Sequence, residues 1–345
     1  MQSQSPFDYG GRITPPGYRG RMEWIANPTV GDWLRARLDT RTGTMHAAVP
    51  HGFEAYARVF HRGFTRSLPG RAVPAPEEWE RMPNAERERL QGEFVDAEVT
   101  WAETAAAFGT TMHALAQWHR LVRTPMAGDW RTRIAPDGRE FDAPTEGELD
   151  PSLLPAVADV LAAHTSTPDA GFAALWEGWG NLVGHLGMPA NPGLFGPSGG
   201  DDPHHQAMLG RSTHDPFNNV FRKPTWQEGL LPREVSEGPR LELPDRAHVL
   251  FSAGPRVFAD PDWVLDAPWR DRPSEQDGFP AYAQSPNLIW PEDRAWVMVT
   301  EIDADSTVIA GSGDLIRALC TDDRIEALPL REGSALTWDS DEVNR

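Results

Sequence analysis

Trp296-Val297-Met298-Val299 is the stretch of sequence that decides the fold. Its apolar residues are consecutive, not alternating, and a strand with this pattern needs cover on both of its faces. The pattern therefore predicts a central strand within a longer β segment, Ala295 to Asp303. Ala304-Asp305 is typical of a short turn, and Ser306 to Ala310 of a second strand, so the sequence predicts an antiparallel hairpin here.

The same kind of pattern predicts further strands and helices on either side of this hairpin. Strands are expected at 53–60, 172–180, 239–243, 247–253 and 325–330. Helices are expected at 29–38, 152–163 and 314–320, and in two or three pieces between 85 and 122, with breaks at Gly92 and Gly109. This arrangement indicates an α+β fold, with a mainly antiparallel sheet and helices packed on one face.

The 345 residues are expected to form a single large domain, 1–345. Helix formers dominate 1–123 and strands dominate 172–345, so the domain can be divided into a helical N-terminal part and a β-rich part. The segment 124–151 is rich in Pro, Gly and Asp and is the best linker candidate. The stretch 187–238 is far longer than an ordinary connection, which indicates a functional or poorly ordered loop.

Charge and composition argue against two classes of partner. Acidic residues outnumber basic ones by 51 to 32, and the formal charge is -19. Such a field repels phosphate backbones and anionic lipids, so neither nucleic acid nor a membrane is expected as a partner. No apolar run is long enough to span a bilayer, and the N-terminus lacks an apolar export segment. Cys320 is the only cysteine, which fits a reducing cytoplasm.

Three phrases are long enough to compare with protein families: VPHGFEAYARVFH at 49–61, ALWEGWG at 174–180 and SPNLIWPEDRAW at 285–296. They resemble a family of uncharacterised proteins common in actinobacteria. The segments TEID at 300–303 and STVIAGS at 306–312 continue the resemblance. It implies a bacterial cytosolic protein and assigns no activity.

Tryptophan and acidic side chains within these phrases are candidates for a binding site. Large aromatic rings can line a pocket for a sugar, a nucleobase or a peptide, and a carboxylate can supply its polar contact. The candidates are Trp176, Trp179, Trp290 and Trp296 with Glu177 and Asp293. The alternative is that these tryptophans pack in the core.

Three carboxylates, Glu301, Asp303 and Asp305, fall on one side of the chain if their segment stays extended. They can then hold Mg²⁺ or Ca²⁺, or act as an acid and base pair. Alternatively, Asp303 and Asp305 form a hairpin turn, because Asp bonds its own backbone in turns.

The long irregular stretch holds the candidate metal ligands. Imidazoles and carboxylates can converge on zinc or a similar ion, although no recognised ligand spacing is present. The candidates are Asp201, Asp202, His204, His205, His214 and Asp215. The alternative is a solvated polar loop. His113 and His119 are expected on different faces of a helix, which argues against joint ligation.

Two short motifs have both a functional and a structural interpretation. Gly196-Pro197-Ser198-Gly199-Gly200 matches a hydrolase nucleophile elbow, but it lacks the strand before the serine and the helix after it. Gly311-Ser312-Gly313 lies between a strand and a helix, where backbone N–H groups can bind phosphate. Asp314 would repel an anion there, so these residues are expected to cap the helix instead.

The sequence thus favours a non-catalytic binding or interaction protein, because no complete nucleophile, phosphate-loop or dinucleotide motif fits its context. The alternative is a metal-assisted or carboxylate-dependent enzyme that uses the 201–215 loop or the 301–305 cluster. The residues assign neither a cofactor nor an oligomeric state.

Overall fold

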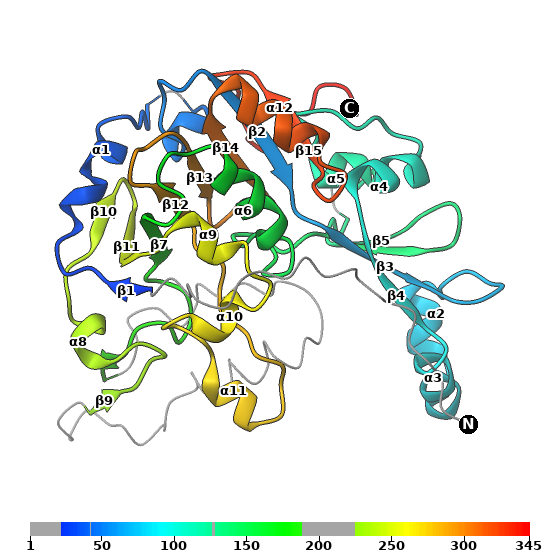
Figure 1. The fold of residues 1–345 in the computed structure, drawn as a ribbon. Helices are drawn as coiled ribbons and strands as arrows, with labels where there is room; N and C mark the ends of the chain where they lie inside the picture. Colours follow the sequence, from blue (N-terminus) through cyan, green and yellow to red (C-terminus); the bar gives the residue numbers. More distant parts are fainter. Residues whose placement is uncertain (1–21, 42, 126–127, 188–224) are drawn as a thin grey trace, which may run out of the picture.

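The computed structural model describes residues 22–41, 43–125, 128–187 and 225–345, and they form a main sheet, a second sheet and helices around both (Figure 1). The strands of the main sheet are β1 (Glu23–Trp24), β2 (Ala55–Phe60), β7 (Gly171–Trp176), β10 (Leu241–Leu243), β11 (Arg246–Ser252), β12 (Leu288–Pro291), β13 (Val297–Thr300), β14 (Ser306–Gly311) and β15 (Ala327–Leu330). Their order is β1-β11-β7-β12-β13-β14-β2-β15, with β10 paired to β11. Every pairing in this sheet is antiparallel.

Helices in the described residues are short, and they belong to different layers. They are α1 (Asp32–Arg35), α2 (Pro76–Arg81), α3 (Asn84–Gln91), α4 (Trp101–Phe108), α5 (Trp118–Leu121), α6 (Leu154–Ala163), α8 (Arg233–Ser236), α9 (Pro255–Phe258), α10 (Trp263–Asp266), α11 (Arg272–Gln276) and α12 (Gly313–Thr321). None of them is long and apolar enough to cross a membrane.

Both faces of the main sheet are buried, as the consecutive apolar residues of β13 require. Met298 belongs to a hydrophobic cluster that α6, α9 and α12 complete on one face. Val297 and Val299 belong to a cluster on the other face, where Leu34 of α1 and Met45 of the 3₁₀ helix Met45–Ala47 pack. The sheet lies between these two layers.

A second antiparallel sheet continues from the first. It has the order β4-β3-β6-β5 and consists of β3 (Gly63–Ser67), β4 (Val95–Val99), β5 (Thr132–Ile134) and β6 (Glu140–Asp142). Only His61 and Arg62 separate β2 from β3, so one run of chain serves both sheets. Gly63 is needed at this junction, because a Cβ there would lie 2.5 Å from the Trp118 ring.

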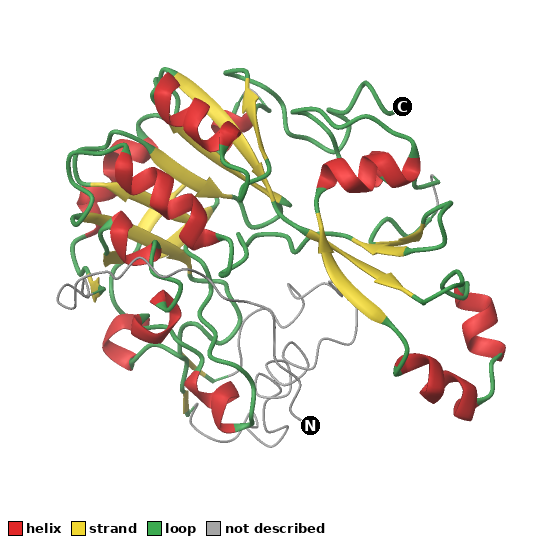
Figure 2. Cartoon of the chain, turned by 45° about the vertical axis from the view of Figure 1, so that its right-hand side comes forward, coloured by secondary structure: helices red, strands yellow, loops and turns green. Residues whose placement is uncertain are grey.

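Residues from α4 and α5 bury one face of this second sheet together with Phe141 of β6. The helices α2 and α3 lie beyond the second sheet, away from the main sheet (Figure 2). A third pair of strands, β8 (His185–Leu186) and β9 (Trp226–Gln227), is antiparallel and stands apart from both sheets.

The predicted α+β class and its mainly antiparallel sheet are confirmed, and so is the central place of the 296–299 strand between β12 and β14. Several boundaries differ. The segment predicted as helical from 85 to 122 contains the strand β4, which pairs with β3 along its length. The predicted linker 124–151 contains β5 and β6. Strand pairing overrides local helix propensity in the first case and supplies the missing hydrogen bonds in the second.

Two further segments differ from expectation. The helix predicted at 29–38 is a 3₁₀ turn, Pro28–Gly31, followed by the short α1, and it covers the face opposite to α6 and α12. The strand β12 is absent from the predicted set, because four residues that end in proline give a weak strand pattern. Of the long stretch 187–238, residues 188–224 lie outside the described residues, and the remainder carries β9 and α8.

Val299 of β13 lies between Leu288 of β12 and Val308 of β14, and it is 5% exposed. Val299→Asp is therefore expected to destabilise the protein by several kcal/mol, because it buries a carboxylate there. Urea unfolding measures the change. Asp339→Asn is the control, since Asp339 is exposed and should shift the midpoint little. A Val299→Asp protein as stable as the wild type would contradict the two-sided burial of β13.

Candidate functional site

The tryptophans singled out from the sequence do not converge. Trp290 and Trp296 are fully buried on opposite faces of the main sheet, so both pack in the core. Trp176 and Trp179 are half-buried and meet edge to face, with ring centroids 5.7 Å apart. The Trp179 indole donates to Asn287 Oδ1 at 3.0 Å.

The two carboxylates proposed as their polar contacts are used elsewhere. Glu177 forms an ion pair with Arg240 at 2.9 Å. Asp293 accepts hydrogen bonds from the Thr165 and Ser166 side chains and from the Ser166 backbone. Because β7 and β12 are antiparallel, Trp176 and Asp293 lie at opposite ends of this strand pair. The structure therefore does not bring them into one site.

The acidic segment 301–305 forms the connection between β13 and β14. The strand ends at Thr300, and the Ala304 N–H donates to the Glu301 carbonyl, which closes a turn. Glu301 and Asp303 both pair with Arg246, at 3.3 and 3.0 Å. Asp305 instead pairs with Arg58 at 3.1 Å. The hairpin interpretation thus agrees with the structure, and each of the three carboxylates is paired with an arginine.

Residues 311–314 cap a helix, as expected. Ser312 Oγ accepts from the Leu315 N–H at 3.2 Å, and Asp314 pairs with Arg317 on the exposed side of α12. The serine motif at 196–200 and the candidate ligands Asp201, Asp202, His204, His205, His214 and Asp215 lie outside the described residues. Within the described ranges, no group of three or more His, Cys, Asp or Glu is placed to hold a metal ion.

His113 and His119 are separated in the structure. His113 Nε2 lies 2.9 Å from the buried carboxylate of Asp341, near the C-terminus. His119 stacks on Trp338, with ring centroids 3.6 Å apart. Burial lowers the pKa of His119 to about 4. Each imidazole holds part of the C-terminal segment in place. The two were expected on different faces of one helix, but only His119 lies in α5, and His113 precedes this helix in an irregular segment.

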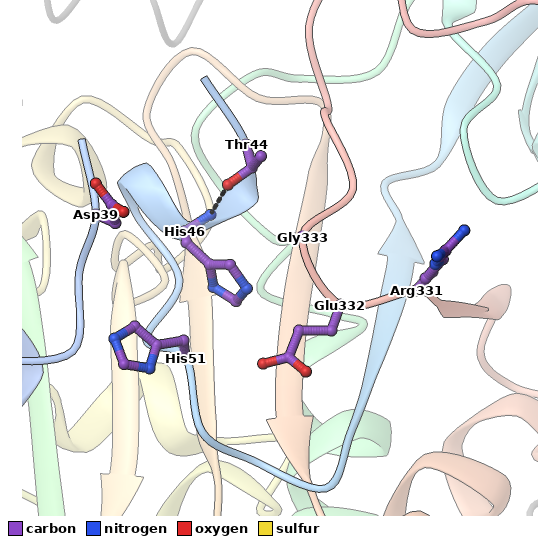
Figure 3. Close-up of a pocket in the computed structure, with 7 residues that line it drawn as sticks. All are labelled: Asp39, Thr44, His46, His51, Arg331, Glu332 and Gly333. Carbon is purple, nitrogen blue, oxygen red and sulfur yellow. Dashed lines mark hydrogen bonds between the residues drawn. The ribbon is translucent and has the colours of Figure 1, made fainter. Parts of the chain in front are cut away.

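A polar surface pocket of about 560 Å³ lies beyond one end of the main sheet (Figure 3). Strand β15 pairs with β2 so that Leu330 faces Tyr56, and the chain after Leu330 forms one wall. The segment after α1 forms the other wall, and the two are joined by a Met45 N–H to Ser334 carbonyl bond of 2.8 Å. The lining residues are Asp39, Thr44, His46, His51, Arg331, Glu332 and Gly333.

His46 is the most buried polar side chain of this pocket, with an exposed fraction of 8%. Its ring meets the rings of His51 and Tyr56 edge to face, at 5.9 and 5.7 Å between centroids. Its Nδ1 lies 2.9 Å from the Val49 carbonyl oxygen. A carbonyl can only accept, so Nδ1 carries a proton and donates to it. Nε2 has no hydrogen-bond partner among the described residues.

Two carboxylates flank the histidines. Glu332 extends toward His46 in Figure 3, and its Oε1 accepts from the Tyr56 hydroxyl at 3.4 Å. Burial raises the pKa of Tyr56, so this hydroxyl stays protonated and donates. The Arg41 backbone N–H lowers the pKa of Asp39, which keeps that carboxylate ionised. Arg331 extends away from both histidines (Figure 3).

Sequence reasoning missed this pocket. His51 lies within the phrase 49–61, but nothing in the sequence indicates that it meets Glu332, which is far along the chain. The missing information is the β2 to β15 pairing, which places 331–333 beside 44–51. The spacing of five positions between His46 and His51 indicates a shared site only once the segment 331–333 is known to lie beside them.

A second group of polar side chains lies at the opposite end of β2. His61 Nδ1 lies 2.9 Å from the Thr145 carbonyl, so Nδ1 carries the proton, and Thr307 Oγ1 donates to Nε2 at 3.0 Å. Thr300 in turn lies 2.6 Å from Thr307. Burial lowers the pKa of His61 to about 4, so the ring stays neutral and this chain of bonds holds the 145–150 loop to the sheet.

Glu148 of the same loop is a buried acid. It accepts from the Tyr282 hydroxyl at 2.6 Å and from the Ser285 N–H at 3.0 Å. Burial raises the pKa of Glu148 to about 7, because a charged carboxylate is poorly solvated there. All of its described contacts are with residues that pack the loop against the sheet.

Comparisons with protein-family models, with curated proteins and with solved structures find no match to this chain.

Glu148 makes stability depend on pH. Its pKa is about 7 in the folded protein against an ordinary 4.5, so the folded state gains less from deprotonation than the unfolded state. The free energy of unfolding should therefore fall by about 3 kcal/mol as the pH rises from the ordinary pKa of 4.5 through the folded-state pKa of about 7. Urea unfolding across this pH range measures the fall.

Glu148→Gln should remove most of this fall. The amide can accept from the Ser285 N–H and donate to Tyr282, whose hydroxyl also lies 3.2 Å from Gln284 Oε1. Glu77→Gln on exposed α2 is the matched control and should leave the fall unchanged. Equal pH profiles for wild type and Glu148→Gln would show that Glu148 is not the group responsible.

Proposed function

We propose that this protein is a non-catalytic binding protein that takes a small polar ligand in the pocket between His46, His51 and Glu332. The observation that carries the proposal is the mostly buried His46 ring, which lines the pocket together with His51 and Glu332. Polar side chains that line a concave site can hydrogen-bond a small ligand. The volume of about 560 Å³ suits a small molecule.

The contacts favour binding over the alternative of a metal-assisted or carboxylate-dependent enzyme. That alternative rests on two segments. In the first, Arg246 pairs with Glu301 and Asp303, and Arg58 pairs with Asp305. The second, 201–215, lies outside the described residues. The seven lining residues given for the His46 pocket, by contrast, lie within the described part of the chain.

The proposal includes a location in the bacterial cytoplasm. The lone Cys320 supports it, and so does the resemblance of 49–61, 174–180 and 285–296 to proteins of actinobacteria. We also propose that nucleic acid is not a partner of this protein, and the formal charge of -19 supports this.

A thermal-shift screen against small polar metabolites tests the pocket. A ligand at about a hundred times its Kd adds about 2.7 kcal/mol to the free energy of unfolding, so Tm should rise by a few degrees. His51→Trp should abolish the rise, because the indole fills the pocket from an exposed position. Glu77→Trp on α2 is the control and should keep it. A ligand that stabilises wild type and His51→Trp equally binds elsewhere and overturns the proposal.

The charge of the protein makes a separate prediction about nucleic acid. Duplex DNA and RNA should show no submicromolar binding at physiological salt, because the net field repels their phosphates. A gel-shift titration measures this. A shifted band at submicromolar protein would remove the charge argument.

A further inference from the structure

An aromatic cluster around α1 continues from the buried face of the main sheet to the surface. The Trp33 ring meets the rings of Phe53 and Trp290 edge to face, with centroids 6.4 and 6.3 Å apart. Trp290 is fully buried and stacks on Phe172 at 5.4 Å, whereas Trp33, Phe53 and Phe172 are half-buried. The cluster is therefore anchored in the core and partly exposed at Trp33 and Phe53.

Two arginines from separate segments lie over the Trp33 ring. The guanidinium carbon of Arg37, which follows α1, is 5.3 Å from the Trp33 centroid and 5.7 Å from that of Phe53. The guanidinium carbon of Arg294, in the turn between β12 and β13, is 5.4 Å from the Trp33 centroid. Both arginines are exposed, and within the described residues neither side chain forms an ion pair or a hydrogen bond. In this they differ from Arg246, which pairs with two carboxylates.

The cluster has hydrogen-bond donors without acceptors. A guanidinium group carries five N–H donors and no acceptor, in a planar fork that matches a carboxylate. The indole N–H groups of Trp33 and Trp290 are buried, and in the described part of the chain they have no acceptor either. Two cations beside one ring also repel each other. Anionic groups placed at the two guanidinium groups would supply acceptors and offset this repulsion.

We propose that Trp33, Phe53, Arg37 and Arg294 form a docking surface for an acidic segment of a partner protein, whose carboxylates pair with the two guanidinium groups. Arginine and tryptophan are the residue types that contribute most to protein interfaces, and stacking on an aromatic ring holds a guanidinium group in position for a planar partner. None of these four residues lines the His46 pocket, so the inference goes beyond the proposed function and can fail independently of it.

An acidic protein segment fits this surface better than a nucleic acid does. The net charge of -19 repels a polyphosphate chain along its whole length, whereas a short acidic segment brings few charges and places them at two arginines. A protein segment also carries apolar side chains, which the half-buried Trp33 and Phe53 can contact.

The test compares two synthetic peptides of one length, hexaglutamate and hexaglutamine. The indole N–H signal of Trp33 in a proton–nitrogen NMR spectrum reports binding at this surface, and its loss in Trp33→Phe assigns it. Hexaglutamate should shift this signal, with saturation at about millimolar peptide, and added salt should weaken the binding. Hexaglutamine should leave the signal in place.

Substitution of the arginines provides the second measurement. Arg37→Gln and Arg294→Gln should each weaken hexaglutamate binding about tenfold, and the double variant should abolish it. Arg81→Gln is the matched control, because Arg81 is an exposed arginine on α2, which lies beyond the second sheet and far from α1 (Figure 1). This control should leave the affinity unchanged. Unfolding midpoints establish that the variants remain folded.

Saturable binding that depends on both arginines supports the inference. A Trp33 signal that hexaglutamate does not move, or a double variant that binds hexaglutamate as tightly as the wild type, overturns it. Tighter binding of hexathymidylate that depends on the same arginines also overturns it, because phosphate would then be the group recognised. The proposed function is tested separately, by ligands that His51→Trp excludes from the pocket.

Discussion

The buried guanidinium of Arg58 is the interaction on which much of this architecture depends. It is 1% exposed, and a charge in that position must be paired and fully hydrogen-bonded to be tolerated. Asp305 supplies the counter-charge, Ser306 Oγ accepts at 2.8 Å, and the Ala114 and Ala116 carbonyls accept at 3.2 and 2.7 Å. One side chain of β2 thereby fixes the hairpin after β13 and the segment that leads into α5.

Strand β2, which holds Arg58, is also fixed by side-chain hydrogen bonds at both of its ends. Beyond Phe60 the chain passes through His61, whose neutral ring bonds Thr145 and Thr307, and enters β3 of the second sheet. At the other end, Tyr56 lies beside Leu330 and donates to Glu332 at the pocket. The pocket is therefore anchored on the strand that carries Arg58, although most of its lining residues are exposed.

The sequence predicts best where a residue pattern has one physical solution. Four consecutive apolar residues at 296–299 have to be covered on both sides, and β13 is central. Ser312 and Asp314 suit the start of a helix, and in the structure Ser312 is the N-cap of α12 and Asp314 lies in its first turn. Val95 to Val99 has no such pattern, since four of its five residues are exposed, and only pairing with β3 makes it a strand. Contacts between distant segments follow from topology, so Glu332 could not be placed beside His46 in advance.

The same reasoning explains why the site candidates chosen from the sequence were not brought together. Trp176 ends β7, and Asp293 follows β12. These two strands are neighbours but antiparallel, so the two residues lie at opposite ends of the strand pair. At the pocket, antiparallel pairing has the opposite effect. It places the start of β2 beside the end of β15, so the segment before β2 and the segment after β15 come together. The segment after β15 then continues to Asp341, which accepts from the Gln117 N–H beside the Arg58 contacts. One wall of the pocket is thus part of a segment that is held at both ends.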